Sequence, residues 1–150
     1  MKILIVDDER PCRDVIRLYL KKMGIDTDLI FEAENVTEAL SVCNTVQPDL
    51  VFLDIQLHDL TGFDFLDQVV NQNFQLVFTT AYDQYAIKAF EYCAIHYILK
   101  PVEEEALKFA LDRAITFQLK AAPEKIEEAK FLYVNTESKY FNLNLTEITH

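Results

Sequence analysis

Short apolar segments recur at even intervals along most of the chain. Each is continuous rather than alternating, which is typical of strands that are buried on both faces of a parallel sheet. The predicted strands are Ile3–Val6, Leu29–Phe31, Leu50–Leu53, Leu76–Phe78 and Tyr97–Leu99. Between them the apolar residues repeat every three or four positions, as on amphipathic helices. With right-handed crossovers, this order predicts an α/β fold with a doubly wound five-stranded parallel sheet over residues 1–120.

Local signals agree with the predicted helices. Pro11 stands where the first helix should begin and Gly24 where it should end. Asn35 and Glu38 have the spacing of a capping box before the second helix. Glu103–Glu105 lie in the expected first turn of the last helix, where the helix dipole favours negative charge.

The pattern changes after residue 120. Residues 121–130 are polar and are interpreted as a linker or an extension of the last helix. Phe131–Val134 and Lys139–Leu145 have strand-like composition with a polar segment between them, which predicts a β-hairpin. Because an isolated hairpin is only marginally stable in water, residues 131–150 either pair with another element or begin a second domain, and we favour the second domain.

Composition excludes several classes of function. The 14 basic and 25 acidic side chains give a formal charge of −11, without the basic stripe that binding to a nucleic-acid backbone requires. Only two glycines occur, too few for a P-loop or a dinucleotide fingerprint.

Cysteine usage and hydropathy bear on location. The three cysteines are far apart in the sequence, so we expect buried free thiols in a reducing cytoplasm rather than a zinc site. No apolar segment is long enough to cross a membrane, and the first residues are too few to form a signal peptide. The sequence therefore predicts a cytoplasmic protein with no membrane partner.

Polar residues follow four of the five predicted strands. In a doubly wound sheet, ligands bind beyond the carboxyl ends of the strands. The residues expected there are Asp7, Asp8 and Glu9 after the first strand, Asp54 after the third, Thr80 after the fourth and Lys100 after the fifth. These side chains should therefore meet at one edge of the sheet.

The chemistry of these residues suits a phosphoryl group and a metal ion. Carboxylates gathered at one edge repel each other, and Mg²⁺ relieves that repulsion. Lys100 supplies a point charge and Thr80 a hydroxyl donor for phosphoryl oxygens. Asp54 is the expected nucleophile, and Asp7 and Asp8 are placed to hold the metal. Each motif alone is common in turns and loops, so the hypothesis depends on their combination.

In combination the motifs resemble a response regulator receiver domain of the CheY-like fold. The resemblance covers about residues 1–120. It is carried by Ile-Leu-Ile-Val-Asp-Asp-Glu at 3–9, Asp-Leu-Val-Phe-Leu-Asp-Ile at 49–55, Thr-Ala at 80–81 and Tyr-Ile-Leu-Lys-Pro at 97–101.

The resemblance implies a phosphoacceptor and a metal site. Asp54 would accept a phosphoryl group from a sensor histidine kinase. Asp8 and Asp54 would bind Mg²⁺ directly, Asp7 through water, and Gln56 through its main-chain carbonyl. The protein would catalyse its own phosphorylation and dephosphorylation at most, and would not otherwise be an enzyme.

The resemblance also implies a switch. Lys100 would neutralise the phosphoryl group and Thr80 would donate a hydrogen bond to it. Tyr97 matches an aromatic residue that swings inward as the threonine moves, and the peptide bond before Pro101 would be cis.

Two positions depart from or modify the family pattern. His58 stands where receivers usually carry a proline, and we expect altered loop rigidity rather than lost chemistry. Tyr82, two residues after Thr80, resembles a position that controls how fast water reaches the phosphoryl group.

Two further segments resemble regulators with a LytTR output domain, as in the AlgR type. Residues 80–92 resemble receivers of that class, and residues 131–148 resemble the opening strands of the LytTR DNA-binding domain. This implies a transcription regulator that forms a homodimer on phosphorylation. It would bind DNA through elements beyond residue 150.

Two other classes remain open from the sequence. A haloacid-dehalogenase-like Mg²⁺ phosphatase also uses an aspartate at a strand end, but it needs a second one two residues later, where Gln56 stands. A phosphorylation-independent pseudo-receiver would serve only as an interaction module, although the complete set of polar residues disfavours it.

Overall fold

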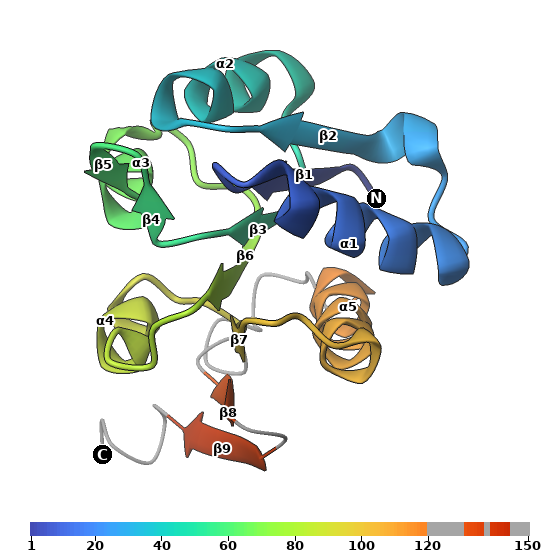
Figure 1. Ribbon diagram of the computed structural model, residues 1–150, viewed down its shortest axis with the longest axis vertical. Coiled ribbons are helices and arrows are strands. Elements are labelled where there is room, and N and C mark those ends of the chain that lie inside the picture. Colours follow the sequence, from blue (N-terminus) through green and yellow to red (C-terminus); the bar gives the residue numbers. More distant parts are fainter. Residues whose placement is uncertain (120–130, 137–138, 145–150) are drawn as a thin grey trace.

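The protein is described by a computed structural model that covers residues 1–119, 131–136 and 139–144 (Figure 1). Five parallel strands lie in the order β2-β1-β3-β6-β7. They are β1 Ile3–Val6, β2 Ile30–Ala33, β3 Leu50–Leu53, β6 Gln75–Thr80 and β7 His96–Leu99. The predicted doubly wound five-stranded parallel sheet is confirmed.

Helices cover both faces of this sheet (Figure 1). They are α1 Arg10–Lys22, α2 Val36–Val46, α3 Gly62–Gln68, α4 Ala86–Glu91 and α5 Glu104–Leu119. Successive strand residues point to opposite faces, so Ile3 and Ile5 pack with α1 and α5 while Leu4 and Val6 pack with the other helices. Both faces are buried, which explains why the strands are continuously apolar in sequence.

Several element boundaries differ from the predicted ones. The second strand begins at Ile30 because Thr27–Leu29 form a short 3-10 helix, whose start is capped by the side chain of Asp26. The observed strand β6 is longer than the predicted strand Leu76–Phe78, so Thr80 is its last residue rather than a loop residue.

Helix ends follow the sequence signals in part. Gly24 has a φ of +92°, the left-handed conformation that commonly ends a helix. Asn35 Oδ1 accepts a hydrogen bond from the main-chain N–H of Glu38 at 2.8 Å. The Glu38 carboxylate accepts from Glu34 instead of Asn35, so the predicted capping box is only half formed. A complete capping box is found instead at Thr61 and Asp64.

The predicted hairpin is formed by β8 Phe131–Thr136 and β9 Lys139–Asn144. β8 lies parallel to β7 and β9 antiparallel to β8, which extends the sheet to seven strands (Figure 1). The hairpin therefore has a partner within the chain. The predicted linker, residues 121–130, lies outside the described residues.

The three cysteines are free thiols, but they are not all buried. Cys43 is buried and Cys12 is half-buried, whereas Cys93 is exposed, so the expectation of burial was wrong for Cys93. Cys93 follows α4 with a φ of +62°, at a helix end that faces solvent. Within the described parts of the chain, no helix is long and apolar enough to cross a membrane.

Candidate functional site

The strand ends bring the predicted polar residues to one edge of the sheet. β1 and β3 are neighbours in register, so Asp7 and Asp54 follow them side by side. β6 and β7 are neighbours on the other side of β3, and the main-chain N–H of Lys100 donates to the carbonyl of Thr80 at 2.8 Å. The parallel register thus places these four residues together, although they are far apart in sequence.

The Lys100 ammonium lies within a cluster of carboxylates. Its Nζ atom is 2.8 Å from Asp7 Oδ2, 2.9 Å from Asp54 Oδ2 and 3.5 Å from Glu9 Oε1. Asp7 is fully buried and Asp54 is 4% exposed. Among the described residues, one half-buried cation therefore compensates two buried carboxylates, which leaves net negative charge at the edge of the sheet.

Burial dominates the electrostatics of these groups. Burial raises the pKa of Asp54 to about 6, although the hydrogen bond from Lys100 opposes the rise. Burial also raises the pKa of Asp7 against the same opposing contact. Burial alone would lower the pKa of Lys100, but the hydrogen bonds to Asp7 and Asp54 outweigh it and raise that pKa. Asp54 is thus a poorly solvated carboxylate whose charge is compensated by the Lys100 ammonium.

A third carboxylate, that of Asp8, completes a candidate metal site. Oxygen atoms of Asp7, Asp8 and Asp54 all lie within 4.8 Å of one another. Closely spaced carboxylate oxygens with only one nearby ammonium are the hard donors that Mg²⁺ prefers. The residues present therefore fit the expected Mg²⁺. No contact of the structure tests the expectation that the Gln56 carbonyl is a further ligand.

The loop after Asp54 is a small hairpin of β4 Gln56–Leu57 and β5 Leu60–Thr61. His58 begins its turn with a φ of +56°, a conformation that the fixed ring of proline cannot adopt. The main-chain N–H of His58 donates to Asp8 Oδ2 at 3.3 Å. The departure from the family pattern at His58 therefore changes the turn and links it to the acidic cluster.

Gly62 is required by close packing beneath Asp54. Its main-chain N–H donates to the carbonyl of Ile55 at 2.7 Å. A Cβ atom at this position would lie 2.5 Å from the main-chain oxygen of Asp54 and 3.0 Å from Leu53 Cγ. The absence of a side chain at Gly62 thus lets α3 begin directly against the loop that carries Asp54.

The predicted switch residues lie on β6 and β7. Thr80 is fully buried, and its Oγ1 atom accepts a 3.4 Å hydrogen bond from the main-chain N–H of Tyr82. Tyr97 is also fully buried, and its hydroxyl donates to the main-chain carbonyl of Tyr82. Both side chains therefore contact the same residue of the loop after β6. The peptide bond between Lys100 and Pro101 is cis.

Three contacts in or beside the site were not foreseen by the sequence reasoning. Glu9 was grouped with the strand-end acids, but its contact with Lys100 was not foreseen. Thr61 and Asp64 form a capping box whose spacing is visible in the sequence. Arg13 donates a hydrogen bond to the Asp7 carbonyl, and no local pattern indicates that contact.

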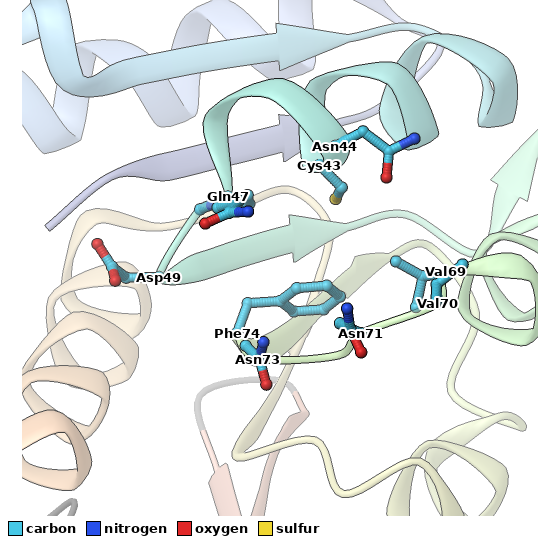
Figure 2. Close-up of a pocket in the computed structure, with 10 residues that line it drawn as sticks. Cys43, Asn44, Gln47, Asp49, Val69, Val70, Asn71, Asn73 and Phe74 are labelled. Carbon is cyan, nitrogen blue, oxygen red and sulfur yellow. The ribbon is translucent and has the colours of Figure 1, made fainter.

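A cavity of about 270 Å³ lies at the opposite end of β3 (Figure 2). It lies where α2 ends, β3 begins and the loop between α3 and β6 passes, and its lining includes Cys43, Phe74 and the amide side chains of Asn44, Asn71 and Asn73. It contains none of the predicted site residues.

Similarity to known proteins agrees with this geometry. The family described as response regulator receiver domain matches residues 3–112. Transcriptional regulatory protein BtsR of Salmonella typhi is 34% identical over 153 residues, which cover 99% of this chain and 64% of that protein. Sensory transduction protein LytT of Enterococcus faecalis is 42% identical over 130 residues, which cover 85% of this chain and 53% of that protein. The chain thus spans between half and two thirds of these curated relatives.

Solved structures share the fold. The receiver domain of NtrX from Brucella abortus superposes with a TM-score of 0.69 at 30% identity, covering 77% of this chain and 98% of that one. A CheY-like receiver domain protein from Methanospirillum hungatei gives a TM-score of 0.72 at 24% identity, covering 81% of this chain and 98% of that one. The chain therefore belongs to the response regulator receiver domain family of two-component systems.

Proposed function

We propose that Asp54 accepts a phosphoryl group from the phosphohistidine of a sensor histidine kinase. The observation that carries this proposal is the buried Asp54 carboxylate, held 2.9 Å from the Lys100 ammonium and close to two further carboxylates. This arrangement offers a nucleophile, a cation for phosphoryl oxygens and donors for a metal ion in one place.

The proposed transfer breaks one bond and forms one. A carboxylate oxygen of Asp54 attacks phosphorus, and the P–N bond of the phosphohistidine breaks. The electron pair of that bond stays on the imidazole nitrogen, which takes up a proton. Lys100 then holds a phosphoryl oxygen in place of the Asp54 oxygen that it contacts before the reaction.

Asp8 and Asp54 would hold Mg²⁺ directly, with Asp7 through water and the Gln56 carbonyl as a further ligand. When bound, the ion neutralises charge on the phosphoryl oxygens. The other residues act by position. Asp7 keeps Lys100 beside the acceptor, because its Oδ2 atom lies 2.8 Å from the Lys100 nitrogen.

The proposed response runs through Thr80 and Tyr97. The phosphoryl group adds negative charge and strong hydrogen-bond acceptors near the end of β6. Thr80 would turn its hydroxyl toward that group, away from its present contact with Tyr82. Tyr97 is hydrogen-bonded to the same residue, so its conformational equilibrium would change together with that of Thr80. The state that the phosphoryl group favours would then favour a homodimer.

The proposed output is transcription regulation through a LytTR-type DNA-binding domain. Two matched relatives carry the names transcriptional regulatory protein and sensory transduction protein. In this proposal residues 1–120 are the receiver, residues 121–130 a linker, and residues 131–150 the first strands of the output domain. DNA would be bound by the parts of the output domain that follow.

Intact mass after incubation with acetyl phosphate and Mg²⁺ tests the proposal. One phosphoryl group should be added to the protein, and none to Asp54→Asn. Asp49→Asn, at the other end of β3, is the matched control and should be labelled like the wild type. Equal labelling of Asp54→Asn would refute the acceptor assignment.

Phosphate release from a monoester, measured beside the intact mass, separates the alternatives. A haloacid-dehalogenase-like phosphatase would release phosphate from a monoester in many turnovers without a stable adduct. A phosphorylation-independent interaction module would show neither adduct nor turnover. Gln56 disfavours the phosphatase, because its exposed amide cannot act as the acid that protonates a leaving group.

A further inference from the structure

Arg13 connects α1 to the turn that carries the acidic residues. Its side chain is 11% exposed, and its Nη1 atom donates to the main-chain carbonyl of Asp7 at 2.6 Å. Its Nε atom donates to Glu32 Oε1 on β2 at 2.9 Å. Two directed bonds from one planar group fix the orientation of that group more tightly than a single charge contact would.

The Asp7 carbonyl belongs to the peptide that joins Asp7 to Asp8. On the other side of Asp7, its main-chain N–H donates to the carbonyl of Ala33 at 3.1 Å. The backbone around Asp7 is therefore held from β2 on one side and from Arg13 on the other. The orientation of this peptide is set by ψ of Asp7 and φ of Asp8, so a bond to its carbonyl bears on the directions of both carboxylates.

We propose that Arg13 is a positioning residue for the metal-binding turn, acting through the Asp7–Asp8 peptide rather than through its charge. This inference rests on the proposed Mg²⁺-dependent phosphorylation of Asp54. It extends that proposal to a side chain on α1 that would hold neither the phosphoryl group nor the metal. Glu32 contributes by holding the guanidinium in the orientation that reaches the carbonyl.

Arg17 provides a matched comparison. It lies one turn further along α1 and also contacts Glu32, with Nη1 3.4 Å from Oε2. Its other hydrogen bond goes to the Ile30 carbonyl on β2 rather than to Asp7. Arg13 and Arg17 therefore share charge, helix and ion-pair partner, and they differ in the contact with the acidic turn.

The positioning role and a pure charge effect predict opposite changes in Mg²⁺ affinity when Arg13 is replaced. Removing a cation near a carboxylate cluster makes the cluster more negative and should tighten Mg²⁺ binding. Losing the orientation of Asp7 and Asp8 should weaken it, by about tenfold if Arg13 acts like other groups that orient metal ligands. The direction of the change in Mg²⁺ affinity thus distinguishes the two roles.

The experiment measures the Mg²⁺ dissociation constant by calorimetry for the wild type, Arg13→Gln and Arg17→Gln, with urea unfolding to verify that each is folded. We expect about tenfold weaker binding for Arg13→Gln and unchanged or tighter binding for Arg17→Gln. If Arg13→Gln does not fold, the pair Arg13→Lys and Arg17→Lys replaces it. A lysine ammonium cannot make both directed bonds, so only Arg13→Lys should bind Mg²⁺ more weakly.

Unchanged or tighter binding in folded Arg13→Gln, or an equal loss in both variants, would overturn the inference. The proposed function would survive that result if the wild type still binds Mg²⁺ and is phosphorylated on Asp54. A wild type that binds no Mg²⁺ would overturn both.

Discussion

The two ends of β3 carry the same residue type in different surroundings. Asp49 precedes the strand, is half-buried, and accepts a 2.7 Å hydrogen bond from the main-chain N–H of Lys2. Asp54 follows the strand, is buried, and faces the Lys100 ammonium. The Asp49 side chain fixes the backbone at Lys2 through this hydrogen bond, whereas the Asp54 carboxylate is poorly solvated and contacts side-chain and main-chain donors around it. Burial beside one shared cation, not residue type, therefore distinguishes Asp54 from Asp49.

The surroundings of the two ends extend this contrast. The cavity near Asp49 is lined mainly by amides and apolar side chains (Figure 2). Burial raises the pKa of the Cys43 thiol in this cavity to about 11, so the thiol stays protonated at neutral pH. The other end gathers buried charge. We therefore expect changes at the cavity end to affect stability and changes at the Asp54 end to affect chemistry.

The largest effect is expected for Phe74→Ala at the cavity end. Phe74 is buried and stacks on Phe65 with ring centroids 6.2 Å apart. Removing the ring should lower the free energy of unfolding by about 3–5 kcal/mol, measured by urea denaturation. The folded variant should still be phosphorylated to the wild-type extent by acetyl phosphate. The exposed neighbour Asn73→Ala, expected within about 0.5 kcal/mol, is the control.

A loss of phosphorylation in folded Phe74→Ala would contradict this contrast between the two ends of β3, because it would show that they are coupled.

Substitutions of the two glycines by alanine are expected to have effects of intermediate size. Gly62→Ala should cost about 1–3 kcal/mol and slow phosphorylation, because its Cβ would lie 2.5 Å from the Asp54 carbonyl oxygen and move that loop. Gly24→Ala should cost about 1 kcal/mol from its left-handed φ alone, since no atom lies within 4 Å of its Cβ. Urea unfolding and the rate of labelling by acetyl phosphate measure both effects. A normal rate in Gly62→Ala would contradict the packing argument.

An effect similar in size to that of Gly24→Ala concerns pH. The pKa of Asp54 is about 6 when folded against 3.8 ordinarily, so its contribution to stability is complete below about pH 3.8 and is lost as the pH rises through 6. Asp54→Asn should remove that loss and stabilise the metal-free protein at pH 7 by on the order of 1–2 kcal/mol. Urea unfolding between about pH 4 and about pH 8 measures it.

Asp112→Asn, an exposed carboxylate on α5, is the control for removing one charge. A variant at Asp54 that is less stable than the wild type at pH 7 would show that the contact with Lys100 outweighs burial.

Much of the site could be predicted because it depends on strand ends. A continuous apolar run fixes where a parallel strand stops, and the next residue is then at the edge where ligands bind. By this reasoning Asp7, Asp54 and Lys100 are expected at one edge of the sheet, and their side chains contact each other there. The same reasoning could not foresee that Lys100 contacts both carboxylates at once, because that depends on distances between three separate strands.

The conformation of His58 is a second feature that the sequence alone could not predict. A proline missing from an expected position indicates a different turn, but not which one. The left-handed φ of His58 follows from the two-residue turn between β4 and β5 and from the contact of its N–H with Asp8.

By itself the sequence determined the strands, the order of the helices and the residue types at the edge of the sheet, because these follow from short-range periodicity and from the end of each apolar run. Only the tertiary structure decided which carboxylate shares the ammonium, that Arg13 holds the Asp7 carbonyl, and that β8 lies beside β7. Such contacts join segments that are distant along the chain. They depend on packing and burial in three dimensions, which no local pattern encodes.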